Sequence, residues 1–325
     1  MADMNVMMMF VSVVLLFLTL RFCVTLFNFL SNPKLGYYGK HFTDKVSIIV
    51  LSSESQIDVS ELFNSIDRQE YKNIEVIVQR DESIAKLIEQ ATGEYYLFIT
   101  PGITIHQGLL NNLIFRTKVF NLAVLSLIPT YNASGFLAQC IYPINDFLML
   151  NLFPLRLVRL SNSPVFAAGS NDCLFFDAEY YKQMIWNDKI SDVLPAATEI
   201  VKQAKQQQFK AEVLLANKFI QNEITQVDFR NFSKGLLMHF SNNSIAALIY
   251  VLLVVPGTLA VLIIFEPVLL TLPAGLIFMS RLMIAFMTSQ NPLYGLLYHP
   301  LQMLFLFVLM FRAVLRRTLT SIKPK

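Results

Sequence analysis

Charged residues are scarce in this sequence of 325 residues, since Asp, Glu, Lys and Arg make up 15% of it while 54% is hydrophobic. Soluble domains carry about 25% charged residues, so this composition is not that of an ordinary water-soluble protein. The 26 basic residues against 23 acidic ones leave a net charge of +3, which excludes the strongly basic surface of a nucleic-acid-binding protein. The large hydrophobic fraction excludes a disordered chain.

Cysteine is also rare. The three residues, Cys23, Cys140 and Cys173, have neither the even number of a disulfide framework nor the close spacing of a metal site. The length is that of about two domain-sized units.

Charged residues are scarcest at the two ends of the chain. Residues 1–30 carry only Asp3 and Arg21, and residues 236–325 carry seven charged residues, whereas the 205 residues between them carry 40. A polar body between apolar ends indicates a membrane-anchored enzyme or receptor domain. We therefore expect a transmembrane helix in 1–32, a cytoplasmic domain in 46–235, and transmembrane or interfacial helices with a basic tail in 236–325.

The first apolar segment runs from Met4 to Leu30 and is long enough for the roughly 20 residues that a membrane-spanning helix needs. It has neither the basic start nor the small-residue cleavage site of a signal peptide, so we interpret it as a spanning helix. Lys34, Lys40 and Lys45 follow it. The positive-inside rule then puts the polar domain in the cytoplasm, at the inner membrane.

Three further apolar segments lie near the other end, at Ile245–Phe265, Val268–Thr288 and Leu301–Leu315. The last one runs into a basic tail, which the positive-inside rule keeps in the cytoplasm. Three full crossings from a cytoplasmic domain would place this tail outside, whereas two full crossings keep it in the cytoplasm. We therefore expect Val268–Thr288, or the segment around His299 and Pro300, to be re-entrant or to lie at the membrane interface.

The polar domain has the alternating pattern of an α/β fold. The runs 46–51, 74–78 and 95–99 are short and rich in β-branched or aromatic residues, as buried parallel strands are. Residues 59–67 and 84–90, between them, are expected to be helical. This order predicts a doubly wound, mostly parallel sheet, whose ligands bind beyond the carboxyl ends of its strands. Ligand contacts are then expected near Ser52–Ser55, Arg80–Ser83 and Thr100–Thr104.

Several of these stretches resemble family 2 glycosyltransferases, namely VSIIVLSSES, NIEVIVQRDES and ATGEYYLFITPGITIHQGLL. LFPLRLVRLSNSPVFAAGSNDCLFF (152–176) and TEIVKQAKQQQFKAEVLL (198–215) resemble the membrane-anchored branch that glycosylates lipids, especially its carotenoid- and hopanoid-associated members. The resemblance covers residues 46–235 and the flanking helices. It implies a GT-A-like fold and transfer of a hexosyl group from a nucleotide sugar to a membrane lipid or polyisoprenoid-type acceptor.

The resemblance also implies acids that this sequence lacks. In the family, an Asp-x-Asp after the third strand holds Mg²⁺ or Mn²⁺, and the sequence here reads Thr100-Pro101-Gly102. The catalytic base of the family belongs to a Glu-Asp pair, whose position here is Ala196-Ala197. His106 without carboxylates is a poor ligand for a hard cation. We therefore expect no metal or other cofactor, and the catalytic residues stay unassigned.

The polar residues that remain at the strand ends are the candidates for ligand binding. Of the family's Asp pair after the second strand, Asp81 remains and either binds a nucleotide or caps a turn. Arg80, at the other position of that pair, either pairs with phosphate in place of a metal or is a solvated loop residue. The nucleotide-sugar candidates are Ser52, Glu54, Arg80, Asp81, Thr100 and Gly102, and the acceptor-side candidates are Gly169, Asp172 and Asp192.

The segment Ile141–Leu160 allows two interpretations. It either lies at the membrane interface with Arg156 and Arg159 near lipid headgroups, or forms a buried helix of the second half of the domain.

Two functions of different classes fit the sequence. The first is a divergent lipid glycosyltransferase that works without the metal. The second is a catalytically inactive relative that serves as a membrane scaffold or as a subunit of a partner enzyme in the membrane.

Overall fold

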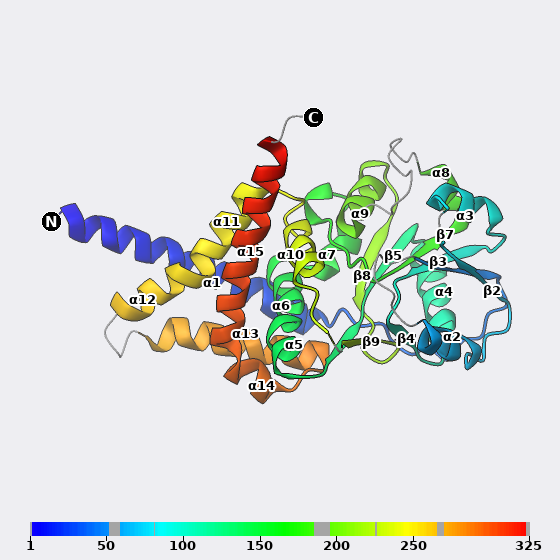
Figure 1. The fold of residues 1–325 in the computed structure, drawn as a ribbon, viewed down its shortest axis with the longest axis horizontal. Helices are drawn as coiled ribbons and strands as arrows, with labels where there is room; N and C mark the ends of the chain where they lie inside the picture. Colours follow the sequence, from blue (N-terminus) through cyan, green and yellow to red (C-terminus); the bar gives the residue numbers. More distant parts are fainter. Residues whose placement is uncertain are drawn as a thin grey trace. The chain divides into compact units, whose positions relative to one another are not determined.

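The computed structural model describes residues 2–51, 59–80, 82–184, 196–224, 226–264 and 270–322. The chain forms two compact units (Figure 1). Unit 1 consists of Met1–Asn32, Ala133–Pro154 and Thr225–Lys325, and unit 2 consists of Pro33–Asn132 and Leu155–Ile224. Residues 133–154, which the sequence placed inside the polar domain, thus belong to the unit that contains the terminal helices.

Unit 2 is built on a six-stranded sheet with the strand order β2-β1-β3-β7-β5-β8. β1 pairs in parallel with β2 and β3, and β5 pairs in parallel with β8, while β7 runs antiparallel to β3 and β5. The mixed α/β class, the mostly parallel sheet and the three strands expected from the sequence are confirmed. The strands are β1 (Val46–Val50), β2 (Ile74–Val78), β3 (Tyr95–Ile99), β5 (Val124–Ile128), β7 (Cys173–Asp177) and β8 (Ala211–Leu215).

Helices cover both faces of this sheet because successive strand side chains point to opposite sides. Leu97 of β3 packs in the same core cluster as residues of α2 (Ser60–Asp67) and α4 (Leu109–Phe120). Its neighbours Tyr96 and Phe98 contact Tyr181 of α8 on the other face. Figure 1 shows α3, α8 and α9 on that second side of the sheet. Their bounds are α3 (Ile84–Gln90), α8 (Ala178–Gln183) and α9 (Ala197–Gln206).

A second, three-stranded sheet has the order β4-β9-β6. It contains β4 (Ile103–Ile105), β9 (Ile220–Ile224) and β6 (Thr130–Ala133). β4 is antiparallel to β9, and the side chain of Asn132 in β6 donates to Glu223 Oε1 in β9 at 2.8 Å. This small sheet was not predicted, and in it β9 lies between β6 and β4, the strand that follows β3.

Glu212 of β8 is buried and forms the centre of an ion-pair cluster. Arg116 of α4 donates to its carboxylate from Nε and Nη2, each at 2.7 Å. Arg159 of α7 (Leu155–Leu160) donates from Nε at 2.8 Å, and Nη1 of Arg156 lies 3.7 Å away. The guanidinium groups of Arg116 and Arg159 also lie over the ring of Phe120. Arg156 and Arg159 therefore turn toward a buried carboxylate, and one negative charge faces three positive ones.

Among the described residues, unit 1 contains four helices that are long and apolar enough to cross a membrane: Val6–Ser31, Ser244–Ile264, Thr271–Thr288 and His299–Leu319. The apolar helices expected from the sequence are thus present, while the number of crossings stays a prediction. The second of them has a π-helical turn, η2 (Leu253–Gly257), around Pro256, which lacks a backbone N–H. The helices of unit 1 are α1 (Ala2–Ser31), α5 (Phe136–Ile141), α6 (Pro143–Leu152), α10 (Phe229–Met238), α11 (Ser244–Leu252), α12 (Thr258–Ile264), α13 (Thr271–Thr288), α14 (Pro292–Leu297) and α15 (His299–Ile322).

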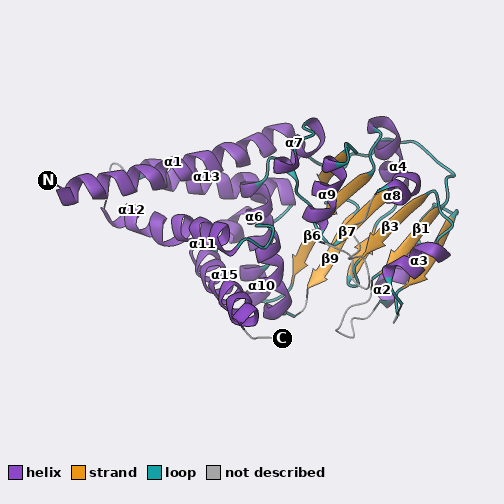
Figure 2. Cartoon of the chain, turned by 90° about the horizontal axis from the view of Figure 1, so that it is seen from above, coloured by secondary structure: helices purple, strands orange, loops and turns teal. Residues whose placement is uncertain are grey.

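Helix α6 is buried among these helices and packs against α1, which itself packs along α13 (Figure 2). The fully buried side chain of Asn28 in α1 donates to the carbonyl oxygens of Leu150 and Phe153 at 2.8 and 2.7 Å. These bonds satisfy carbonyl groups at the end of α6 that have no partner within the helix. The segment Ile141–Leu160 is therefore neither one interfacial segment nor one buried helix of the polar domain. Its first part belongs to unit 1, and its last part, α7, packs on β8 in unit 2.

We predict that Glu212→Gln strongly destabilises the protein. The substitution keeps the size of the side chain but leaves three guanidinium groups without a buried countercharge, which costs about 3–5 kcal/mol. A lower melting temperature of the purified full chain in detergent measures this loss. Glu199→Gln is the matched control, because that side chain is 44% exposed and its ion pair with Lys202 is at 4.0 Å. Equal melting temperatures for the two variants would contradict the role of Glu212.

Candidate functional site

The carboxyl ends of β1 and β3 lie at one edge of the six-stranded sheet. Because β7 runs the other way, its first residue lies at this same edge, so residue 172 comes next to residue 100. The backbone N–H of Thr100 donates to the carbonyl oxygen of Asp172 at 3.0 Å, and its hydroxyl donates to the same oxygen at 3.3 Å. The structure thus brings together one nucleotide-sugar candidate and one acceptor-side candidate.

Asp172 is the acid at the centre of this edge. Its Oδ2 accepts a hydrogen bond from the hydroxyl of Tyr131 in β6 at 2.7 Å and another from the hydroxyl of Ser170 at 2.5 Å. Burial raises the pKa of Asp172 above its ordinary value, although the two hydroxyl groups act in the opposite direction. A carboxylate held in a fixed position with a raised pKa is suited to accept a proton.

The loop before Asp172 is fixed to the sheet by Ser126 of β5. The backbone N–H of Ser170 donates to Ser126 Oγ at 2.8 Å, and Ser126 Oγ donates to the carbonyl oxygen of Ser170 at 3.2 Å. Both serines are buried. This pair of bonds sets the position of Ser170, and therefore that of the carboxylate that Ser170 contacts.

Gly169 lies against the first residue of α9. A Cβ added at Gly169 would be 2.7 Å from Cβ of Ala197 and 2.8 Å from its carbonyl carbon, which is closer than real Cβ atoms approach other atoms. The side chain of Asn171 accepts a hydrogen bond from the backbone N–H of Ala197 at 2.6 Å. Position 197, where the resemblance expects a catalytic acid, is therefore buried and packed against Gly169.

The turn after β3 lacks the ligands of a divalent cation. Thr100, Pro101 and Gly102 carry no carboxylate, and Gly102 adopts a positive φ of 85°. The backbone N–H of His106 donates to the carbonyl oxygen of Phe219 at 2.8 Å, and Nε2 of its ring is buried without a hydrogen-bond partner among the described residues. Within the described ranges, no three His, Cys, Asp or Glu side chains are arranged to hold a metal ion. The residues seen at this position do not fit Mg²⁺ or Mn²⁺.

Arg80 lies farther from Asp172 than the other described candidates. It follows β2, which is separated from β3 by β1, so about 10 Å of sheet separates its strand from that of Thr100. Its side chain is exposed. The candidates Ser52, Glu54, Asp81 and Asp192 lie outside the described residues.

Three residues of the site were not predicted from the sequence: Ser126, Tyr131 and Ser170. Ser170 stands two positions before Asp172 in the sequence, and this closeness to a predicted site residue is the only sequence feature that could have indicated it. Tyr131 and Ser126 are 41 and 46 residues away along the chain and approach only through β6 and β5.

Comparison with known proteins gives distant structural likenesses. No protein-family model and no curated protein matches the sequence. Fragment 1–349 of S. aureus TarS in complex with UDP is similar with 14% identity and a TM-score of 0.34, over 60% of this chain and 65% of that fragment. The same fragment with UDP-GlcNAc gives 10% identity and a TM-score of 0.36, over 82% of this chain and 90% of the fragment. The mannosyltransferase PcManGT from Pyrobaculum calidifontis, in complex with GDP-Man and Mn²⁺, gives 12% identity and a TM-score of 0.49, over 96% of this chain and 100% of that one.

We predict that Gly169→Ala destabilises the protein by about 1–3 kcal/mol, because the added methyl group overlaps Ala197. Thermal unfolding of the full chain measures the effect. Gly235→Ala in α10 is the control, since a Cβ there meets nothing within 4 Å and alanine gains up to about 1 kcal/mol of helix propensity. A Gly169→Ala variant that melts at or above the wild-type temperature would contradict the close packing of this loop on α9.

Proposed function

We propose that the protein is a membrane-bound enzyme that transfers a hexosyl group from a nucleotide sugar to a membrane lipid or polyisoprenoid-type acceptor, in the manner of family 2 glycosyltransferases. The observation that carries this proposal is the braced carboxylate of Asp172 at the carboxyl edge of the sheet. Open α/β sheets bind their ligands at this edge. The sequence resemblance over residues 46–235 supports the reaction class and the lipid branch.

Attachment to the inner membrane, with unit 2 in the cytoplasm, is part of the same proposal. Four apolar helices support membrane attachment. Lys34, Lys40 and Lys45 follow the first of these helices, which supports a cytoplasmic position for the residues after it.

Sugar transfer requires a base that takes the proton of the acceptor hydroxyl group and groups that stabilise the negative charge of the departing diphosphate. The acceptor hydroxyl oxygen attacks the anomeric carbon of the sugar, and the bond from that carbon to the diphosphate oxygen breaks. The diphosphate keeps the bonding electrons, and Asp172 receives the proton of the hydroxyl group. Its raised pKa makes Asp172 a stronger base than an ordinary aspartate.

The negative charge on the diphosphate calls for cationic or hydrogen-bonding groups at the strand ends. Arg80 is exposed after β2 and is suited to pair with phosphate through two parallel hydrogen bonds. The other candidates for the nucleotide-sugar side remain Ser52, Glu54, Asp81, Thr100 and Gly102, and Gly169 and Asp192 remain candidates for the acceptor side.

A second candidate function is a catalytically inactive scaffold, or a subunit of a partner enzyme in the membrane. The specific observation that favours it is the contact between Gly169 and Ala197, which fills the position where the family has its base. On this proposal the carboxyl edge binds a nucleotide sugar weakly or not at all, and the hydroxyl groups around Asp172 serve the structure of the loop.

We predict that Asp172→Asn abolishes transfer but preserves binding. The substitution keeps the contacts with Tyr131 and Ser170 and removes the proton acceptor, so turnover falls by roughly 10²–10⁴-fold. Calorimetry of the purified full chain with UDP-glucose and GDP-mannose, with and without Mg²⁺, measures binding. Release of the nucleoside diphosphate in the presence of a membrane lipid extract measures transfer.

Glu199→Gln is the control for this experiment, because Glu199 is a surface residue on α9 with an ordinary, loose ion pair. Binding heat without added metal and turnover that only Asp172→Asn removes are the expected results. Wild-type protein that gives no heat with either nucleotide sugar contradicts the transferase proposal. Stable co-purification with another membrane protein in mild detergent would then favour the scaffold.

We also predict a specific pH dependence of the transfer rate. Asp172 must be ionised to accept a proton, so the rate falls as the pH drops through its raised pKa, at a pH above the ordinary value of 3.8. Because folding favours the protonated form of Asp172, its ionisation destabilises the folded state as the pH rises through that pKa. Asp172→Asn should therefore melt at the same temperature as the wild type or higher at neutral pH. A rate that stays constant well below the ordinary pKa of aspartate would exclude Asp172 as the base.

A further inference from the structure

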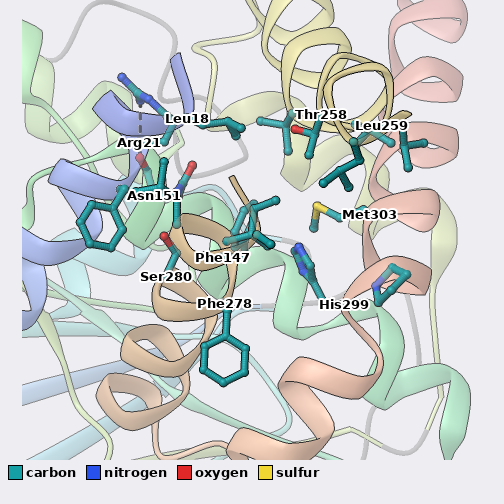
Figure 3. A pocket seen from close by; sticks show the side chains of 18 of the residues that line it. Leu18, Arg21, Phe147, Asn151, Thr258, Leu259, Phe278, Ser280, His299 and Met303 are labelled. Carbon is teal, nitrogen blue, oxygen red and sulfur yellow. Dashed lines mark hydrogen bonds between the residues drawn. The ribbon is translucent and has the colours of Figure 1, made fainter. Parts of the chain in front are cut away.

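We propose that unit 1 binds an anionic membrane lipid, with one apolar chain in a cavity between its helices and the headgroup near Arg21 (Figure 3). The cavity has a volume of about 420 Å³, within the range of small-molecule sites in proteins. Residues of α1, α6, η2, α12, α13, α14 and α15 line it, and all belong to unit 1. This proposal does not depend on sugar transfer.

The greater part of the cavity wall is apolar. It includes Leu18, Phe147, Leu259, Leu276, Phe278 and Met303. Leu259 and Phe278 are 55% and 43% exposed, so the cavity opens at the outer surface of helices that are apolar enough to cross a membrane. In a bilayer this surface faces lipid chains. An apolar occupant can therefore enter from the bilayer without passing through water.

A smaller part of the wall is polar. Figure 3 shows Arg21 and Asn151 at one end of the group of lining side chains, with Ser280 near them and His299 farther along beside Met303. Nη1 of Arg21 donates to the carbonyl oxygen of Asn151 at 3.5 Å, which is a long bond. Nε of Arg21 and Nδ1 of His299 are buried without a hydrogen-bond partner among the described residues. A ligand with acceptor oxygens would relieve the cost of these unpaired groups.

A second arginine adds to the positive charge at this wall. Arg281 of α13 is only 3% exposed, and its Nε and Nη2 have no partner among the described residues. Its guanidinium lies 5.1 Å from the ring centroid of Phe147, which lines the cavity. The acid that interacts electrostatically with Arg281 is Asp146, whose Oδ2 accepts from Gln290 at 2.5 Å. Nε and Nη2 of Arg281 still lack a hydrogen-bond partner among the described residues, and a negatively charged headgroup would complement them.

Both cations lie well inside their helices. At 1.5 Å per residue, Arg21 lies about 15 Å from the end of α1 at Ser31, and Arg281 lies about 10 Å from the end of α13 at Thr288. Charged side chains so far inside an apolar helix are costly unless they face the interior of the bundle or meet a partner, and an anionic headgroup at this end of the cavity would supply that partner. The occupant therefore has both an apolar chain and an anionic group.

Native mass spectrometry of the full chain in detergent tests this proposal, with phosphatidylglycerol and phosphatidylcholine of identical chains as probes. We expect one bound phosphatidylglycerol and weaker binding of phosphatidylcholine. Arg21→Gln removes a charge-assisted contact and should weaken phosphatidylglycerol binding about tenfold, down to the level of phosphatidylcholine. Arg312→Gln is the matched control, since Arg312 is an exposed arginine of α15 that does not line the cavity.

A second variant separates loss of the site from loss of the fold. Ala274→Phe adds an apolar side chain at the cavity wall without changing any charge, and it should weaken the binding of both lipids. Equal phosphatidylglycerol binding by Arg21→Gln and Arg312→Gln would overturn the proposal, as would unchanged binding by Ala274→Phe. Wild-type protein that binds neither lipid, and carries another polypeptide instead, would identify a protein as the occupant and also overturn it.

Discussion

The reversed direction of β7 is the constraint on which the candidate site depends. The other five strands of the sheet run in one direction, and β7 lies antiparallel between β3 and β5. A parallel strand at this place would put residue 172 at the opposite edge, away from Thr100. With β7 reversed, the loop 169–172 reaches the edge where β1 and β3 end, and Ser126 of β5 can hold it there through Ser170. The carboxylate of Asp172 is therefore positioned by pairing within the sheet and not by the loop alone.

The chemistry of this edge differs from that of a metal site in a specific way. Hydroxyl groups of Tyr131 and Ser170 surround one acid, where the resemblance expects several acids around a cation. Hydroxyl donors stabilise a single carboxylate without adding charge, so the described residues put little negative charge at the edge and offer little to a divalent cation. Burial then raises the pKa of that carboxylate, which no nearby cation lowers among the described residues. The same arrangement suits a base that works without a metal and also suits a loop whose acid is purely structural. Turnover of Asp172→Asn separates these two functions, because its structural contacts survive.

Local patterns predicted the first half of unit 2 well. The strands β1, β2 and β3 and the helix α3 have the expected bounds to within one residue, because short β-branched runs and helical spacing are properties of neighbouring residues. Features that depend on distant pairing were not predictable in the same way. Tyr131 approaches Asp172 only because β6 joins a three-stranded sheet, and Arg159 turns toward Glu212 only because α7 packs on β8. The packing of Gly169 on Ala197 is likewise invisible in the sequence, where both residues read as small and neutral.

Buried arginine occurs in both units, and its surroundings differ in a way that bears on function. In unit 2, the carboxylate of Glu212 accepts hydrogen bonds from Arg116 and Arg159 directly, so the cost of burying charge is met within the protein. In unit 1, Arg281 interacts electrostatically with Asp146, but its Nε and Nη2 have no hydrogen-bond partner among the described residues, and its guanidinium lies over Phe147, which lines the cavity. The cluster around Glu212 therefore has a structural role, because removing one partner leaves an uncompensated buried charge. The arrangement around Arg281 leaves two donors without an acceptor, and this is the cost that the proposed lipid headgroup would relieve. Lipid binding in unit 1 and catalysis in unit 2 can therefore be tested separately, and the first can hold for an enzyme and for a scaffold alike.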